Sequence, residues 1–119
     1  MNGKKHRITF IVPAYNEENN IRRFHEETNK TLRGLNNYTC EFVFIDDGSN
    51  DSTWQVIKET SNLDSAVKGL RLSRNFGKEM ALTAGIIEWT KFSDAVIFMD
   101  ADLQHPPSVI PKLIQQWEL

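Results

Sequence analysis

The 119-residue sequence contains a single cysteine, Cys40, which excludes an internal disulfide. No apolar run approaches the roughly 20 residues that cross a bilayer, and the polar N-terminus does not resemble a secretory signal peptide. Neither sign of charge is in large excess, because 14 basic and 16 acidic residues leave a formal net charge of −2. Bulk charge therefore gives no reason to expect a nucleic-acid partner. We expect one soluble domain with a single core.

Four short apolar runs predict β-strands, and helical patterns separate them. Three of the runs are nearly continuous in Ile, Val and Phe, which is typical of strands buried on both faces of a parallel sheet. The predicted strands are 7–12, 41–46, 67–72 and 95–100, and the predicted helices are 17–35, 51–62, 77–91 and 106–118. This alternation predicts an α/β fold with a mostly parallel sheet and helices on both faces.

The most polar segments follow three of the predicted strands. They are PAYNEE (13–18), DDGSND (46–51) and DADLQH (100–105). In a sheet of order 3-2-1-4, the carboxyl ends of strands 1, 2 and 4 are neighbours. Open α/β sheets bind their ligands beyond the carboxyl ends of the strands, where the strand order reverses. The topology therefore brings the three polar segments together.

The DADLQH segment offers oxygen ligands for a metal ion. Asp100 and Asp102, with Gln104, suit a hard cation such as Mg²⁺ or Mn²⁺. Such an ion would neutralise a departing diphosphate. The same residues also suit a strand end followed by a turn, and His105 is either a further ligand or a turn residue.

The DDGS segment places two aspartates side by side at a buried strand end. Asp46 and Asp47 repel each other and need a donor or a cation. Gly48 favours a tight turn, and the polar residues after it can cap the next helix. Asp47 can accept hydrogen bonds from a base or a ribose, so we interpret it as a residue that binds and recognises a nucleoside.

The PAYNEE segment combines a strand terminator with an aromatic residue and acids. Pro13 is expected to end the strand, Tyr15 to stack beside a base, and Glu17 to accept from ribose or base. We expect Asn16 to cap the following helix and Glu18 to lie at the positive end of that helix.

The SRNFGKE segment (73–79) is a basic turn that enters a helix. Arg74, Lys78 and the free amides of the helix start could face phosphate. The segment is not a Walker A loop, because G-x-x-x-x-G-K is absent. It could also be a loop with two surface cations.

Taken together, VPAYNEE, FIDDGSNDST, LSRNFGKE and MDADLQHPP resemble, in order and spacing, the nucleotide-sugar-binding half of family 2 glycosyltransferases. The closest branch is the dolichyl/polyprenyl-phosphate sugar transferases, which include bactoprenol glucosyltransferases and dolichyl-phosphate mannose synthases. The likeness covers residues 8–119. It implies the GT-A fold, a Rossmann-like α/β sandwich.

The resemblance also implies roles for particular residues. It assigns a nucleoside pocket, a metal and diphosphate cluster, and a basic loop near the donor. The pocket residues are Pro13, Tyr15, Glu17 and Asp47; the metal ligands are Asp100, Asp102 and Gln104, the two aspartates being the catalytic residues; and the loop residues are Arg74 and Lys78.

The implied reaction is the inverting transfer of a hexose from a UDP- or GDP-sugar to polyprenyl phosphate, assisted by Mg²⁺ or Mn²⁺. One alternative is transfer to a sugar hydroxyl. Another is a phospho-receiver signalling domain, although its acidic pair would have to follow strand 1 rather than strand 2.

Family members continue well past DADLQHPP. We therefore expect residues 1–119 to be the N-terminal, nucleotide-sugar-binding part of a longer enzyme that works at the cytoplasmic face of the membrane. The acceptor half and any transmembrane region would be absent, and the part alone would be inactive. We also expect self-association, because strand 4 would leave an unpaired apolar edge.

Overall fold

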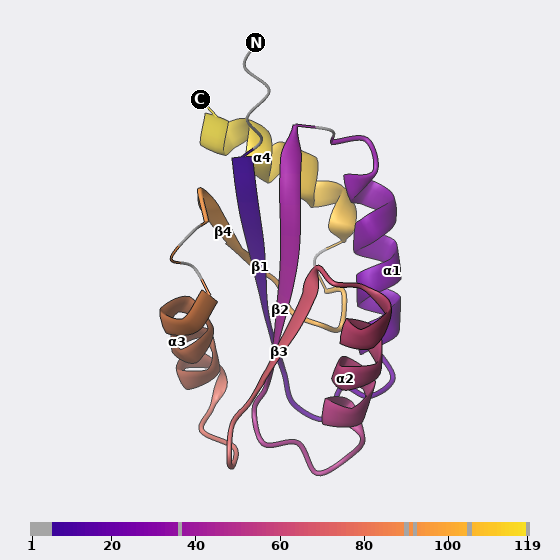
Figure 1. Cartoon of the computed structure of the whole chain (residues 1–119), viewed down its shortest axis with the longest axis vertical. Coiled ribbons are helices and arrows are strands. Elements are labelled where there is room, and N and C mark those ends of the chain that lie inside the picture. The colour runs from indigo at the N-terminus through magenta and orange to yellow at the C-terminus, as the bar shows by residue number, and fades with distance from the viewer. Residues whose placement is uncertain (1–5, 36, 90, 92, 105, 119) are drawn as a thin grey trace.

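A four-stranded parallel sheet forms the centre of the computed structural model, which describes residues 6–35, 37–89, 91, 93–104 and 106–118 (Figure 1). Its strands are β1 (His6–Ala14), β2 (Tyr38–Asp46), β3 (Val67–Arg71) and β4 (Ala95–Phe98), in the order β3-β2-β1-β4. The helices are α1 (Ile21–Leu32), α2 (Thr53–Leu63), α3 (Lys78–Trp89) and α4 (Ile110–Glu118), with a 3₁₀ turn η1 (Pro107–Val109) before α4. The predicted α/β class, strand order and parallel pairing are confirmed.

Helices cover both faces of the sheet, which explains the continuous apolar strands. Side chains alternate across a strand, so Phe10 and Val12 of β1 face one layer and Ile11 faces the other. The first layer contains α1, α2 and α4, and the second contains α3 (Figure 1). Residues 8–12 of β1 are therefore buried on both faces of the sheet.

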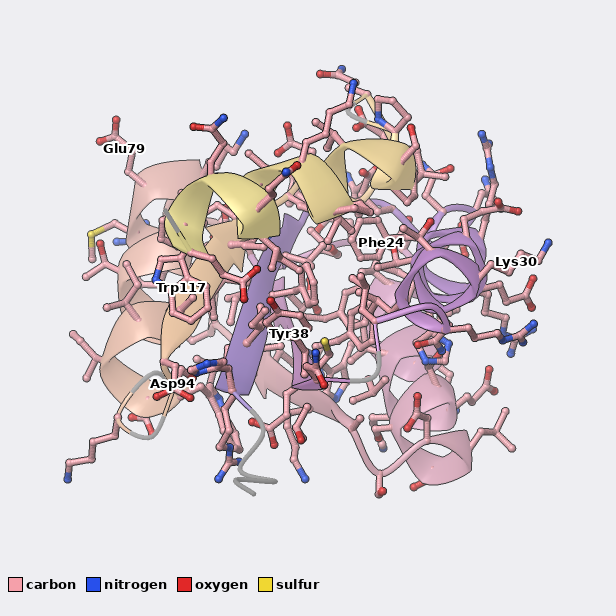
Figure 2. The ribbon with its side chains drawn as sticks, turned by 90° about the horizontal axis from the view of Figure 1, so that it is seen from above. Phe24, Lys30, Tyr38, Glu79, Asp94 and Trp117 are labelled. Carbon is pink, nitrogen blue, oxygen red and sulfur yellow. The ribbon has the colours of Figure 1, made fainter. Side chains whose placement is uncertain are left out.

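Aromatic rings fill the layer under α1 and α4. Phe10 stacks on Phe42 with ring centroids 5.4 Å apart, and Phe24 of α1 meets the ring of Phe44 edge-on at 5.9 Å. Figure 2 shows Phe24 pointing inward from α1, whereas Lys30 on the same helix points away from the molecule. The helix follows its amphipathic pattern, with one apolar stripe on the core.

β1 continues past Pro13 to Ala14, so the prediction that proline ends the strand is wrong by one residue. The carbonyl of Ala14 accepts from the N–H of Asp47, the residue that follows β2, and the carbonyl of Ile11 accepts from the N–H of Met99. In a parallel strand, the backbone N–H and C=O groups of residues 11 and 13 face the same neighbouring strand. The backbone nitrogen of Pro13 therefore faces the side on which β4 lies. Because β4 ends at Phe98, the missing N–H of Pro13 costs no ladder bond.

The last helix begins later than the sequence predicts. Pro106 is extended, with ψ of 143°, and α4 starts only after the turn η1. A proline disfavours the helical conformation of the residue before it, and Pro107 acts on Pro106 in this way.

β4 is an edge strand of the described sheet, as the sequence predicts. An apolar groove runs beside it, where half-exposed Phe98 lies near Leu113 and Trp117 of α4. Self-association through this edge stays a prediction. No helix in the described part of the chain has both the length and the apolar character to cross a membrane.

A polar cluster joins α1 to the end of α2. His25 Nε2 lies 2.7 Å from Asp64 Oδ2, and the N–H of Ala66 donates to Asp64 Oδ1 at 2.9 Å. Burial raises the pKa of Asp64, but the hydrogen bonds from Ala66 and His25 outweigh burial, so this pKa lies below its usual value. The ionised carboxylate therefore stabilises the folded chain.

We expect Asp64→Asn to reduce the free energy of unfolding at pH 7 by about 1 kcal/mol. The pKa of Asp64 in the folded chain is lower than its unfolded value of about 3.9. The stabilisation by the ionised carboxylate is therefore fully present at pH values above the unfolded pKa. The contribution disappears as the pH falls through the folded pKa. Urea denaturation gives the free energy of unfolding at pH 7 and at pH 3. This free energy should fall less between the two pH values for Asp64→Asn than for the wild type. Glu26→Gln, at an exposed position, is the control. Equal losses in both proteins would contradict this role of Asp64.

Candidate functional site

The polar segments that follow β1, β2 and β4 meet at one end of the sheet. Asp47 N–H donates to Ala14 at the end of β1, and Met99 N–H donates to Ile11, so the three exits are adjacent. Figure 1 shows the loops after β1 and β2 at the end of the molecule opposite the chain termini. Figure 2 looks onto the other end, at which β2 begins with Tyr38 and β4 follows Asp94. The predicted convergence is therefore confirmed.

The loop after β1 is held by the loop after β2. Asn16 has a φ of 53°, and its Oδ1 accepts from the N–H of Asn50 at 2.8 Å. Its own N–H donates to Ser49 Oγ, and the N–H of Glu17 donates to Thr53 Oγ1, both at 2.8 Å. These bonds fix the positions of the residues on either side, Tyr15 and Glu17.

The expected helix-capping roles of Asn16 and Glu18 are therefore wrong. α1 begins at Ile21, four residues after Glu17, and no acidic residue lies in its first turn. Glu18 instead accepts from the N–H of Ser52 at 3.4 Å. Asparagine readily adopts positive φ, so the residue type that caps a helix can equally make a turn.

Asp46 lies fully buried at the end of β2. Its Oδ1 accepts from the N–H of Ser49 at 3.0 Å, and its Oδ2 lies 3.7 Å from Nε of Arg71 on β3. Arg71 thus supplies one cation that the acidic pair requires. Sequence reasoning missed Arg71, although its position as the last residue of the strand beside β2 is the signal that could have found it.

Asp47 anchors the loop between β3 and α3. Its Oδ1 accepts from the N–H of Phe76 at 2.8 Å, and its Oδ2 accepts from the N–H of Gly77 at 3.0 Å and from Asn75 Nδ2 at 3.2 Å. A carboxylate has about four acceptor positions, so three of them are occupied. Asp47 is 3% exposed, and it has a structural role that the sequence reading missed.

Gly48 allows the loop between β3 and α3 to lie close to the backbone of the turn after β2. Its φ is +69°, and a Cβ at this position would lie 2.2 Å from the carbonyl carbon of Arg74. The guanidinium of Arg74 in turn lies 4.2 Å from the centre of the Phe76 ring. The segments DDGS and SRNFGK therefore form one unit.

Lys78 reaches the aspartate that follows β4. Its Nζ lies 2.6 Å from Asp100 Oδ1, so this cation compensates a carboxylate that follows a largely apolar strand. Lys78 is the first residue of α3, and Asp100 lies two residues beyond β4. This pair joins the basic loop to the DADLQH segment.

Glu17 is affected both by burial and by the charges of other carboxylates. Burial has the largest effect on Glu17 and raises its pKa; a hydrogen bond from Asn20 lowers it, and the charges of Asp102, Asp100 and Asp51 raise it further. The net shift in the pKa of Glu17 is upward, chiefly because of burial, and the neighbouring negative charges act in the same direction. A cation between them would relieve this repulsion.

Two adjoining hollows open at this end of the sheet. The larger, of about 680 Å³, lies between Tyr15, the turn 48–50 and the segment 71–75. The smaller, of about 250 Å³, contains five of the predicted site residues: Pro13, Tyr15, Asp47, Lys78 and Asp100. Tyr15 borders both and is 43% exposed, so its ring is free to stack on a flat ligand.

The residues after β4 fit a divalent ion only as part of its shell. Among the described residues, no three Asp, Glu, His or Cys side chains converge as a complete metal site. Asp102 is exposed, and its Oδ1 accepts from the backbone N–H of Gln104 at 3.3 Å. Carboxylate oxygens suit a hard cation that takes further ligands from phosphate and water. The side chain of Gln104 is exposed, and His105 lies outside the described residues.

The family described as glycosyl transferase family 2 matches residues 9–119. The chain belongs to this family. It is 45% identical over 112 residues to the bactoprenol glucosyl transferase of Shigella phage SfX, covering 94% of this chain and 36% of that protein. It is 44% identical to the prophage bactoprenol glucosyl transferase homolog of Escherichia coli, again with 94% and 36% covered. The chain thus spans about one third of the length of these curated relatives.

Two solved structures have a similar fold over most of this chain. The mannosyltransferase PcManGT from Pyrobaculum calidifontis, in complex with GDP-Man and Mn²⁺, matches with a TM-score of 0.74 and 22% identity, covering 93% of this chain and 32% of that one. S. aureus TarS in complex with UDP matches with a TM-score of 0.63 and 22% identity, over 94% and 32%. The predicted GT-A fold is therefore confirmed, and the receiver-domain alternative is wrong.

Proposed function

We propose that the chain is the donor-binding part of an inverting glycosyltransferase that transfers a hexose from a nucleotide-sugar to polyprenyl phosphate. The observation that carries the proposal is the convergence of Tyr15, Asp47, Lys78 and Asp100 on one hollow at the carboxyl ends of the strands. Relatives named bactoprenol glucosyl transferase support the acceptor class. Since the chain spans about a third of these relatives, we propose that it supplies the donor side alone and transfers no sugar by itself.

The proposed reaction is a direct displacement. An oxygen of the acceptor phosphate attacks the anomeric carbon from the side opposite the nucleoside diphosphate. The new C–O bond forms as the bond to the β-phosphate oxygen breaks, and its electron pair leaves with the diphosphate. A phosphate acceptor is already ionised at neutral pH, so no strong general base is needed. Consistent with this, the described residues that line the smaller hollow include acids, a lysine and a tyrosine but no histidine.

The residues of this chain bind and orient the donor. We propose that the ring of Tyr15 stacks on the base, and that Pro13 and Glu17 border the nucleoside. Asp47 fixes the loop 73–77 through three hydrogen bonds, and one acceptor position remains for the nucleoside. Lys78 and Arg74 of the loop face the diphosphate.

We propose that Asp100, Asp102 and Gln104 provide the protein's oxygen ligands to Mg²⁺ or Mn²⁺. The bound ion would stabilise the charge of the leaving diphosphate. The remaining ligands would come from phosphate and water, which agrees with the incomplete shell among the described side chains. The residues themselves fix where the diphosphate can lie.

Calorimetric titration of the purified chain with UDP and with GDP tests the proposal. We expect one of the two to bind at micromolar to millimolar concentration, and at least about tenfold more tightly with Mn²⁺ than with EDTA. Adenosine diphosphate serves as a base-mismatched control. Absence of Mn²⁺-dependent binding for every nucleotide would contradict the proposed function.

A further inference from the structure

The contact between Lys78 and Asp100 places a cation where the proposed metal would bind. Lys78 Nζ is 2.6 Å from Asp100 Oδ1, a distance typical of a charge-assisted hydrogen bond. The side chain of Lys78 is 60% exposed, and that of Asp100 is 27% exposed. Both side chains are therefore accessible to solvent, so an ion from solution can reach this pair.

The position of Lys78 in its helix makes this charge easy to move. It is the first residue of α3, and a cation at a helix N-terminus is disfavoured by the helix dipole. The adjacent carboxylate, rather than the helix, holds the ammonium in place. A lysine head on a flexible four-carbon stem can reach another anion a few ångströms away without movement of the backbone.

The surrounding charges explain why a counter-ion is required. The negative charges of Asp102, Asp100 and Asp51 all act to raise the pKa of Glu17, so this end of the sheet is acidic. Lys78, in direct contact with Asp100, offsets one of these negative charges. A divalent ion at Asp100 would have to compete with Lys78, and a bound diphosphate would offer the displaced ammonium a new partner.

We propose that Lys78 is an exchangeable counter-ion that couples metal binding to donor binding. It neutralises Asp100 while the site holds no donor, and it moves to the diphosphate oxygens when the metal takes Asp100. The inference rests on the proposed function, and it goes further because it assigns one side chain two successive partners. Its consequence is that metal alone binds weakly, whereas metal and nucleotide bind together.

Mn²⁺ binding measured by the electron paramagnetic resonance signal of free Mn²⁺ tests this exchange. Without nucleotide, Lys78→Met should bind Mn²⁺ about fivefold more tightly than the wild type, in line with the modest strength of a partly exposed ion pair. With Mn²⁺ present, the same variant should bind UDP or GDP about tenfold more weakly, because one charged contact to phosphate is lost. Lys58→Met removes the same charge from an exposed position on α2 and should change neither affinity.

The outcomes separate this inference from the proposed function. If the wild type binds nucleotide with Mn²⁺ but Lys78→Met leaves the affinity for Mn²⁺ alone unchanged or weaker, the counter-ion role is wrong and the proposed function stands. If Lys58→Met has the same effect as Lys78→Met, the effect is one of net charge, and the role is again wrong. If neither Mn²⁺ nor nucleotide binds to any variant, both proposals are overturned.

Discussion

Asp102→Ala should reduce the affinity of the chain for UDP or GDP in the presence of Mn²⁺ by about tenfold or more, to the value measured in EDTA. Asp102 is exposed, and its Oδ1 accepts from the backbone N–H of Gln104, two residues further along the same turn. Its loss should therefore leave the core intact. If the protein supplies only part of the metal's shell, as proposed, each carboxylate would have a large share in holding the ion. Calorimetric titration with and without Mn²⁺ gives both affinities.

Asp102→Asn separates the effect of the Asp102 charge on Mn²⁺-dependent binding from the effect of the turn geometry, and Glu26→Ala is the control. Asp102→Asn keeps an oxygen that can accept from the N–H of Gln104 but removes the charge, so it should lose most of the Mn²⁺ dependence. Glu26→Ala removes an exposed carboxylate from α1 and should behave as the wild type. Unchanged Mn²⁺-dependent binding in Asp102→Ala would show that the ion has another ligand.

Gly48→Ala should lower the free energy of unfolding by about 3 kcal/mol or more, since it combines backbone strain with overpacking. The φ of +69° is unfavourable for alanine, and the added Cβ would meet main-chain atoms of Arg74 and Asn75 at 2.2 and 2.3 Å. Backbone atoms cannot move aside as a side chain can. Relief of the clash would require the loop 73–77 to leave Asp47, which would also weaken nucleotide binding.

Gly34→Ala is the matched control for this prediction. A Cβ at Gly34 would meet no atom within 4 Å, so the same chemical change should shift stability by less than about 1 kcal/mol. Urea denaturation compares the two, and amide chemical shifts of residues 74–77 report whether the loop has moved. A Gly48→Ala chain as stable as Gly34→Ala would contradict the close docking of the two segments.

The fold could be predicted because its strands are buried on both faces. Runs such as 7–12 and 41–46 contain too many apolar residues for a half-exposed sheet, and their alternation with helices restricts the topology to a few parallel orders. The convergence of Tyr15, Asp47 and Asp100 followed from that order. These conclusions depend on patterns many residues long.

The details that failed depend on single residues. Asn16 suits a helix cap and a left-handed turn equally well, and only the partners offered by Ser49 and Asn50 favour the turn. Pro13 was expected to end β1, but the neighbouring strand ends first. Neither the partners of Asn16 nor the point at which β4 ends can be predicted from the local sequence.

The ion pairs across the site could also not be predicted from the sequence. Lys78 and Asp100 lie 22 residues apart, and their contact depends on where α3 starts relative to the end of β4. The bonds from Phe76 and Gly77 to Asp47 involve main-chain N–H groups, which every residue except proline has. Sequence alone therefore indicated which residues gather, but not which of them touch.

Paramagnetic broadening by Mn²⁺ tests the central claim most directly. In the isotope-labelled chain with UDP or GDP, substoichiometric Mn²⁺ should broaden the amide signals of Tyr15, Lys78 and Asp102, which lie at the carboxyl ends of the strands. The signals of Tyr38 and Asp94, at the opposite end, should keep their intensity. Broadening centred on Tyr38 and Asp94, or uniform broadening at every amide, would contradict a donor site at the carboxyl ends of β1, β2 and β4.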